Sequence, residues 1–166
     1  MNERASIDST VLVTGVTPGT LGFETSRVIA LQKPKLLIIA GRNSSKLQDV
    51  QDSLKEAALG VEVRQLKVDL GSLKSVREAA IAINGWTDVP IVDVVINNAG
   101  IMAQPYSLTE DGIESQFAAN HVAHFLLTQL IIGKVLASKN PRVVNLSSNG
   151  YKSGPVRFDD YNFKVC

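Results

Sequence analysis

The segment at residues 10–25 constrains the fold more than any other part of this sequence. An apolar run at Thr10–Thr14 predicts a short strand, and a helical pattern follows at Leu21–Leu31. Glycines punctuate the turn between them, at Gly15, Gly19 and Gly22. Glycine lets a backbone bend sharply and approach a ligand closely, and the free N–H groups of a helix N-terminus favour an anion. The segment therefore predicts a phosphate-binding turn, with a strand-to-helix loop that binds nothing as the alternative.

The spacing of these glycines narrows the prediction. It reads G-x3-G-x2-G, which differs from the G-x-G-x-x-G fingerprint of dinucleotide-binding proteins. No Gly-Lys-Ser/Thr sequence follows, so the turn is not a P-loop. Other parts of the chain must therefore decide what the turn binds.

The composition is that of an ordinary globular domain. The chain has 166 residues, of which 45% are hydrophobic and 20% charged, and its formal net charge is +1. This length is sufficient to bury a core, and the near-neutral charge lacks the basic signature of nucleic-acid-binding proteins. We therefore expect no nucleic-acid partner.

Local sequence argues against two further classes of protein. The apolar runs at residues 36–40, 91–96 and 125–132 are much shorter than a membrane span. Residues 1–9 lack the apolar core of a secretory signal. Cys166 is the lone cysteine, which excludes an internal disulfide framework and a cysteine zinc cluster. We expect a reducing compartment, with the cytoplasm as the default location.

Apolar runs and helical patterns alternate along the whole chain. The run at residues 35–40 is continuous rather than alternating, which is typical of a strand buried on both faces of a parallel sheet. The expected strands are residues 10–14, 35–40, 61–68, 91–96 and 141–146, and the expected helices are residues 21–31, 44–59, 72–83 and 112–138. This order predicts an α/β fold with a doubly wound parallel sheet of the Rossmann type, formed by residues 1–166 as a single dinucleotide-binding domain.

Polar and glycine residues follow each expected strand. Doubly wound sheets bind ligands at the carboxyl ends of their strands, so these residues are expected to converge on one edge. They are residues 15–22, Arg42, Asp69, residues 97–100, and the pair Ser147 and Ser148. The convergence of these residues on one edge is stronger evidence for a ligand-binding site than any one motif.

Arg42 follows the second expected strand, where a dinucleotide-binding fold often has an acid that binds the adenosine ribose hydroxyls. A guanidinium at this point suits a 2′-phosphate instead, because it is planar, permanently charged and bidentate. The alternative is a solvated loop arginine. We favour the phosphate, which selects NADP over NAD and argues against a methyltransferase. Asp69 closes the third strand, where it could bind the adenine amino group or cap the helix that begins near Ser72.

The next strand ends in two amides, Asn97 and Asn98, which could tie neighbouring strands together or mark a simple turn. Ala99 and Gly100 leave room for a ribose or nicotinamide. Asn120 interrupts a strongly apolar helical pattern, so a buried amide there needs hydrogen-bond partners and could hold a water or a kinked carbonyl.

Histidine and serine side chains also lie near these segments. His121 and His124 are three positions apart and supply at most one pair of ligands, so we expect no metal site. Ser147 and Ser148 are expected to face the pocket. No histidine–acid pair and no Gly-x-Ser-x-Gly elbow accompanies them, so a hydrolase triad is unsupported.

Together these segments resemble the short-chain dehydrogenase/reductase family, closest to its retinol-dehydrogenase-like branch, including fungal members. The resemblance is carried by residues 14–22, 41–43, 68–70, 97–100, 109–117, 120–128 and 142–148. The family's turn usually reads T-G-x3-G-x-G, and Leu21 stands where its third glycine is usual.

The resemblance implies hydride transfer between NADP(H) and a small-molecule carbonyl or alcohol substrate. The cofactor residues it implies are Thr14, Gly15, Thr17, Gly19, Leu21, Gly22, Arg42, Asp69, Leu70, Asn98, Ala99 and Gly100. Asn120 would be the catalytic asparagine that orients a proton-relay water. Ser148, more than Ser147, would hold the substrate oxygen.

The family completes its site with a Tyr-x-x-x-Lys pair downstream of the serine. Here Tyr151 is followed four positions later by Pro155, and Tyr161 by Val165. We therefore expect a C-terminally incomplete fold with little or no turnover. Its last strand would be an exposed sheet edge, open to homo-oligomers or other association. The alternative is a non-catalytic dinucleotide-binding or interaction protein.

Overall fold

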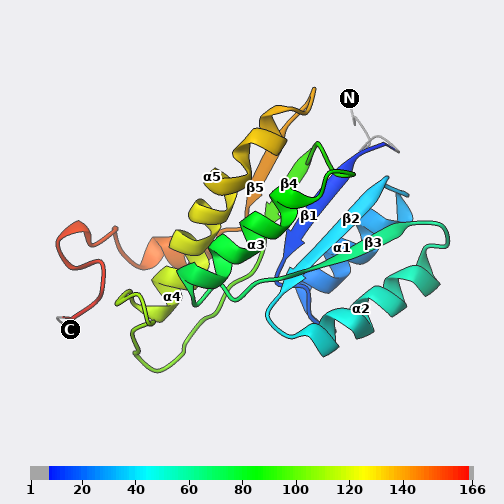
Figure 1. The fold of residues 1–166 in the computed structure, drawn as a ribbon. Helices are drawn as coiled ribbons and strands as arrows, with labels where there is room; N and C mark the ends of the chain where they lie inside the picture. Colours follow the sequence, from blue (N-terminus) through cyan, green and yellow to red (C-terminus); the bar gives the residue numbers. More distant parts are fainter. Residues whose placement is uncertain (1–7, 165–166) are drawn as a thin grey trace.

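The computed structural model describes residues 8–164, and the expectations that concern residues 1–7, Val165 and Cys166 lie outside this range. Five parallel strands form one sheet in the order β3-β2-β1-β4-β5. Helices cover both faces of the sheet, α1 and α2 on one side and α3 and α5 on the other (Figure 1). The doubly wound parallel fold predicted from the sequence is confirmed.

The bounds of most elements lie within a few residues of those expected. The strands are β1 at Thr10–Thr14, β2 at Leu36–Gly41, β3 at Glu62–Lys67, β4 at Val94–Asn97 and β5 at Arg142–Asn145. The helices are α1 at Leu21–Leu31, α2 at Ser44–Ala57, α3 at Leu73–Gly85, α4 at Ser115–Phe117 and α5 at Ala123–Leu136.

Two apolar cores lie on opposite faces of the sheet. In β1, Val11 and Val13 pack with α1 and α2, whereas Leu12 packs with α3 and α5. Each central strand therefore buries side chains on both faces, which is the physical reason for the continuous apolar runs in the sequence.

Two expected elements begin three residues later than predicted. The strand expected at residues 91–96 begins at Val94, because the preceding Asp93 is fixed by its side chain, which accepts from Thr10 N at 2.7 Å and from Ser138 Oγ at 2.6 Å. The helix expected at residues 112–138 begins at Ser115, after a turn in which Gly112 has a φ of 73°.

The same long helix is not regular. Residues Ala118–Val122 are π-helical, between the short α4 and the long α5. A π-helical turn inside an α-helix is rare and frequently occurs at a functional site. A π-helical turn contains one more residue than an α-helical turn, and the apolar periodicity of the sequence could not reveal it.

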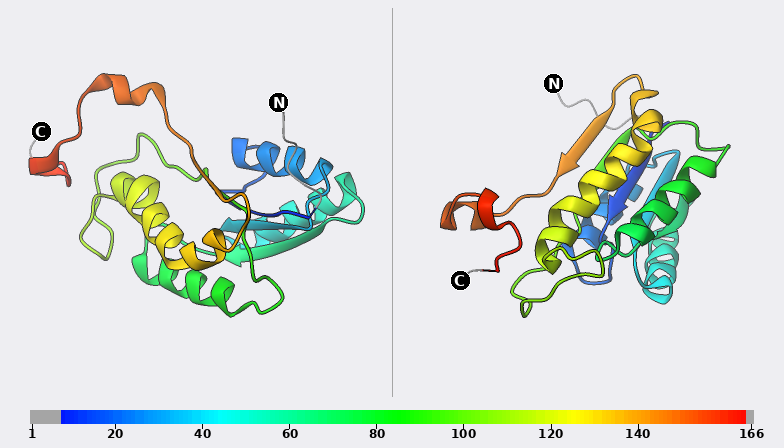
Figure 2. Two further views of the ribbon diagram at one scale, coloured as in Figure 1. Left: turned by 90° about the horizontal axis from the view of Figure 1, so that it is seen from above. Right: turned by 60° about the vertical axis from the view of Figure 1, so that its left-hand side comes forward.

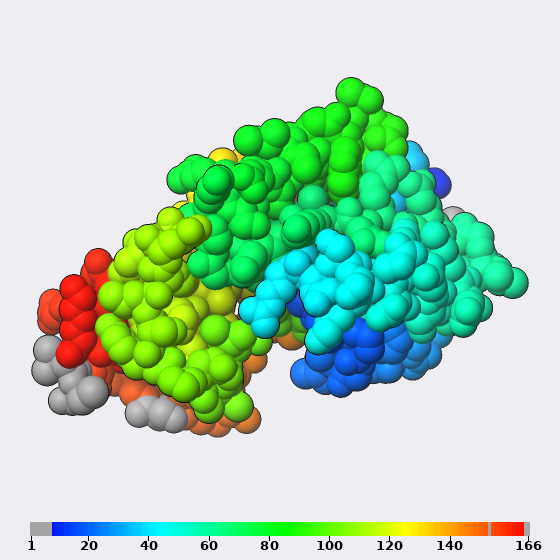
Figure 3. Space-filling model, turned by 60° about the horizontal axis from the view of Figure 1, so that its bottom comes forward, coloured from blue at the N-terminus to red at the C-terminus, as the bar shows by residue number. Residues whose placement is uncertain are grey.

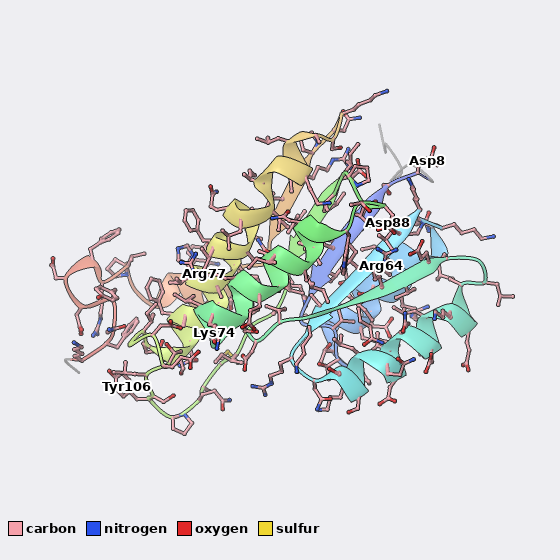
Figure 4. All side chains as sticks on the ribbon, viewed as in Figure 1. Asp8, Arg64, Lys74, Arg77, Asp88 and Tyr106 are labelled. Atoms are coloured by element: carbon pink, nitrogen blue, oxygen red, sulfur yellow. The ribbon has the colours of Figure 1, made fainter. Side chains whose placement is uncertain are left out.

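Arg64 fastens the loop between α3 and β4 to strand β3. Its guanidinium lies 2.7 Å from Asp88 Oδ2 and 2.6 Å from Glu62 Oε1, and 5.0 Å from the centre of the Trp86 ring. Figure 4 labels Arg64 and Asp88 side by side. The hydrogen bond from Arg64 lowers the pKa of the Asp88 carboxyl. Both side chains are partly exposed, so this cluster orders the loop more than it stabilises the fold.

Strand β5 lies at an open edge of the sheet. Val143, Val144 and Leu146 are 39%, 43% and 47% exposed, and Phe125 on α5 is 63% exposed. The expectation of an exposed sheet edge is therefore confirmed. Beyond β5 the chain runs away from the sheet and returns beside α4 (Figure 2). Within residues 8–164, no helix combines the length and apolar character that a membrane crossing requires.

Candidate functional site

A cavity of about 630 Å³ lies at the carboxyl ends of the strands. Figure 3 looks onto this edge and shows a hollow between the segment after β2 and the loop near residues 101–115. The resemblance implies twelve cofactor residues and two catalytic ones, Asn120 and Ser148, and ten of these fourteen line the cavity: Gly15, Thr17, Leu21, Gly22, Arg42, Asp69, Leu70, Asn98, Ala99 and Gly100.

Two of the three glycines close the floor of this cavity. Gly15 has a φ of 74°, and a Cβ there would lie 2.6 Å from Ala99 Cα. At Gly22 a Cβ would lie 2.4 Å from the Gly15 carbonyl oxygen. No side chain fits at either position, so backbone alone faces a ligand. Gly19 has a φ of 77° but nothing within 4 Å of a Cβ, and it does not line the cavity.

Helix α1 begins at the cavity wall. Thr20 caps it, accepting from Phe23 N at 3.4 Å and donating to Thr17 O at 2.7 Å. Leu21 and Gly22 belong to the first turn, where backbone N–H groups have no intrahelical acceptor. With the positive end of the helix dipole, these groups form a surface that favours an anion. A threonine just before a helical pattern is a capping signal that would have identified Thr20 from the sequence.

Arg42 stands at the opposite wall, just after β2. Its side chain is exposed, and within the described part of the chain it has no ion-pair partner. The next residue, Asn43, caps α2 by accepting from Lys46 N at 3.1 Å. The guanidinium is therefore available to an anion in the cavity.

Asp69 does not cap helix α3. Ser72 is the cap and accepts from Ser75 N at 3.3 Å. Asp69 Oδ1 instead accepts from Gly71 N at 2.9 Å, in a turn at the cavity wall. The capping alternative for Asp69 is therefore wrong, and its carboxylate shapes the loop that lines the cavity.

Asn97, the last residue of β4, and Asn98, which follows it, tie the sheet together, as expected. Asn97 Nδ2 donates to Asn145 Oδ1 at 2.8 Å, and Asn98 Nδ2 donates to Thr14 O at 2.8 Å. Thr14 itself is fully buried beneath the cavity. Its hydroxyl oxygen accepts from Asn98 N at 3.0 Å and Ala99 N at 3.1 Å. Thr14 thus supports the cavity wall and does not line it.

Asn120 is exposed rather than buried, which corrects the sequence expectation. Its Oδ1 accepts from Ile101 N at 2.8 Å, and its Nδ2 donates to Ile101 O at 2.9 Å. It lies on the π-helical segment Ala118–Val122. Its side chain belongs to a neighbouring groove of about 550 Å³, lined also by Tyr106, Phe117 and Phe163.

Ser148 does not line the cavity. In the segment that follows β5, Leu146 is the residue that lines it. Its side chain is exposed and accepts from Gly150 N at 3.1 Å, capping the 3₁₀ helix Asn149–Ser153. The structure thus does not bring Ser148 and Asn120 into the cavity with the ten other residues.

The two histidines have different surroundings. His121 is exposed and stacks on Phe117, with ring centroids 5.5 Å apart. His124 is buried, and burial lowers its pKa below the ordinary value of 6.5. Among residues 8–164, no group of three histidine, cysteine, aspartate or glutamate side chains could hold a metal ion.

Several residues of the site carried no recognised sequence signal. Gly71, Ser115, Ala119 and Leu146 line the cavity because loops of the fold bring them there. Their types are common throughout the chain, so only the three-dimensional arrangement distinguishes them.

Comparison with known proteins agrees with this geometry. Residues 9–162 match the family model described as short chain dehydrogenase. The chain is 40% identical to human retinol dehydrogenase 13 over 156 residues, which cover 94% of this chain and 46% of that protein. It therefore spans about half the length of this relative.

Two solved structures share the fold. A protein from Mycobacterium paratuberculosis superposes with a TM-score of 0.79 and 35% identity, over 98% of this chain and 55% of that one. A short chain dehydrogenase from Shigella flexneri, complexed with NADP, has a TM-score of 0.74 and 26% identity, over 93% of this chain and 65% of its own. The chain therefore belongs to the short chain dehydrogenase family and is retinol-dehydrogenase-like in sequence.

Proposed function

We propose that residues 1–166 act as one dinucleotide-binding domain that prefers NADP(H), within a family of oxidoreductases. The observation that carries the proposal is Arg42, an exposed guanidinium at the cavity wall with no ion-pair partner in the described part of the chain. No acid follows β2 that could bind adenosine ribose hydroxyls in its place. The solved relative complexed with NADP supports the same class of ligand.

The cavity fits such a cofactor. Its floor is backbone at Gly15 and Gly22, where no Cβ has room, so a pyrophosphate could lie against it and the first turn of α1. Arg42 would hold the 2′-phosphate by paired hydrogen bonds. Asp69 and Leu70 would flank adenine.

The wall at residues 98–100 would hold the nicotinamide half. When bound, the cofactor supplies or accepts the hydride, and the substrate would be a small carbonyl or alcohol. Asn120 would act by fixing the backbone of Ile101. Ser148 lies outside the cavity, so its proposed contact with the substrate oxygen requires the segment after β5 to turn toward the cavity. Thr14 and Gly19 would support the same site without lining it. Thr14 lies beneath the floor formed by Gly15 and Gly22, and Gly19 lies beside it.

Turnover by these 166 residues is proposed to be weak or absent. They contain no Tyr-x-x-x-Lys sequence, which is the pair that the family uses for general acid–base catalysis, worth roughly 10²–10⁴-fold in rate. Because β5 presents an open edge, self-association through that edge is part of the proposal. A reducing compartment such as the cytoplasm is the proposed location.

Fragments of the cofactor test the proposal directly. Adenosine 2′,5′-bisphosphate and 5′-AMP differ by the 2′-phosphate and would compete with NADPH for the purified chain. We expect the bisphosphate to displace NADPH at a concentration about tenfold lower than 5′-AMP requires. A tenfold difference in affinity corresponds to the free energy of about one hydrogen bond to a charged group. Equal competition by the two fragments would refute the role given to Arg42. Failure of NADPH to bind would refute the whole proposal.

A further inference from the structure

The geometry points to His124 as a positioning residue, held as the neutral tautomer with its proton on Nδ1, that links the cavity wall to Asn120. This inference rests on the proposed function only in taking the cavity as the cofactor site. His124 lies on α5, is 4% exposed and does not line the cavity. It therefore acts on the site through the residues it contacts.

The imidazole joins two separate elements. Its Nε2 lies 2.9 Å from Thr14 Oγ1, at the end of β1. Its Nδ1 lies 3.3 Å from the backbone carbonyl oxygen of Asn120, on the π-helical segment. Each ring nitrogen thus has one oxygen atom within hydrogen-bonding distance.

The hydrogen bonds of Thr14 decide which nitrogen carries the proton. A hydroxyl accepts two hydrogen bonds and donates one. Thr14 Oγ1 already accepts from Asn98 N at 3.0 Å and Ala99 N at 3.1 Å. It must therefore donate, and His124 Nε2 at 2.9 Å is a nearer acceptor than Ile96 O at 3.5 Å.

An accepting Nε2 leaves the proton of the neutral ring on Nδ1. That proton points to the Asn120 carbonyl oxygen, which can only accept. Every donor and acceptor in the chain of contacts is then satisfied. With the proton on Nε2 instead, the Nε2 N–H would be a third donor to Thr14 Oγ1, whose two lone pairs already accept from Asn98 N and Ala99 N. Nδ1 would then face the Asn120 carbonyl oxygen with no proton between them.

The consequence is that one ring supports both ends of a cavity wall. Through Thr14 it holds the amides of Asn98 and Ala99. Through the π-helical segment it steadies Asn120, whose side chain holds Ile101 N and O at 2.8 and 2.9 Å. Residues 98–101 are thereby anchored at both ends. Burial keeps the pKa of His124 low, which favours the neutral ring.

The tautomer is measured by ¹⁵N NMR of the full chain with labelled histidine. We expect His124 to show a protonated Nδ1 and an unprotonated Nε2 at neutral pH. His121 is the internal control, because an exposed ring gives averaged signals of two exchanging tautomers. A protonated Nε2, or an averaged signal at His124, would overturn the inference.

Two isosteric variants separate positioning from packing. His124→Gln places its side-chain amide near the position of Nε2, where the amide oxygen can accept a hydrogen bond from the Thr14 hydroxyl. His124→Asn has a shorter side chain that places the amide near the position of Nδ1, so the hydrogen bond to Thr14 is lost. We expect the Gln variant to retain the slow amide exchange of Asn98 and Ala99 and an NADPH Kd within about twofold of the original.

The Asn variant should show faster exchange of the same amides and an NADPH Kd raised about tenfold. Equal effects of both variants would mean that only the volume of the ring matters, and would overturn the inference. If a variant does not fold, the tautomer of the original chain decides the question. If NADPH does not bind at all, the proposed function fails while the tautomer and amide exchange still test His124.

Discussion

The side-chain amide of Asn98 donates to the backbone carbonyl of Thr14 at 2.8 Å, and so joins the end of β4 to the end of β1. The same nitrogen would lie 2.5 Å from a Cβ at Gly22. Strand end, glycine turn and helix start are therefore packed against one another at a single point. A change at any one of them is transmitted to the cavity floor.

Substitution of Gly22 by alanine should disrupt this point of contact. The added methyl would lie 2.4 Å from the Gly15 carbonyl oxygen, a backbone atom that cannot move without opening the floor. We expect a loss of about 1–3 kcal/mol in the free energy of unfolding, measured by urea denaturation, and weaker NADPH binding. Gly133→Ala on α5 is the control, because nothing lies within 4 Å of its Cβ, and it should be neutral or stabilising. Equal losses in the two variants would contradict the packing argument.

Charge reversal at Arg42 should change cofactor preference. Arg42→Asp removes the guanidinium at the cavity wall and adds repulsion, so NADPH binding should weaken about 10- to 100-fold while NADH binding changes little. Lys35→Asp is a matched control, because Lys35 precedes β2 as Arg42 follows it, and it lies outside the cavity. Calorimetric titration of both cofactors distinguishes the cases. Equal weakening of NADPH and NADH would contradict the 2′-phosphate assignment.

Glu114 should make the fold sensitive to acid. Burial alone would raise its pKa, but hydrogen bonds from Gln116 N at 2.9 Å, Phe117 N at 2.7 Å and Ser115 outweigh this and lower it. A carboxyl with a lowered pKa in the folded state stabilises the fold above its unfolded pKa, near 4.5, and loses that effect as the pH falls through its folded pKa.

Glu114→Gln should therefore cost about 1 kcal/mol at neutral pH, the value of a helix cap, and less in acid. Urea unfolding of the original chain and of Glu114→Gln, from neutral pH into the acid range, measures the difference in the free energy of unfolding. A difference that stays constant from neutral pH into the acid range would show that the carboxylate charge is not what stabilises the start of α4.

Asn162 should hold the C-terminal segment against the rest of the fold. It is 6% exposed, accepts from Glu114 N at 2.8 Å and donates to Gly112 O at 2.9 Å. Asn162→Ala leaves both backbone groups unpaired, at a cost of about 1–3 kcal/mol. Hydrogen exchange should become faster at residues 112–117 and 158–164. Lys164→Ala, an exposed neighbour, should leave exchange unchanged, and protection retained in Asn162→Ala would refute this anchoring role.

The open edge at β5 should permit self-association. Arg142 N donates to Asp93 O, just before β4, and Leu146 N donates to Asn97 O at its end. The backbone groups of Val143 and Asn145 therefore face outward. Val144→Lys should shift the chain toward monomer, because a charge on an edge strand opposes pairing. Ile81→Lys, on the exposed face of α3, is the control. Sedimentation equilibrium that shows a monomer for the unsubstituted chain at all concentrations would contradict association.

The strand ends were the most predictable part of the site. Each apolar run stops where the sheet stops, so the residues after it must share one edge, and ten of the predicted residues line one cavity there. The long helix was less predictable. Its residues 118–136 are apolar enough to be read as regular helix, and the π-helical turn arises from packing that no periodicity records.

Residues on irregular segments could not be placed from the sequence. Asn120 was expected to be buried because its neighbours are apolar, yet it faces outward and binds the Ile101 backbone. Ser148 lies after a strand that has no neighbour on its outer side, so nothing in the described chain turns it toward the cavity. For Asn120 the decisive contact is with a residue 19 positions away in the sequence.

Binding of NADPH and NADH to the purified 166-residue chain, measured side by side by isothermal titration calorimetry, tests the central claim most directly. The account predicts that both bind and that the Kd for NADPH is lower by about tenfold or more. Equal affinities, tighter binding of NADH, or no binding of either cofactor would contradict it.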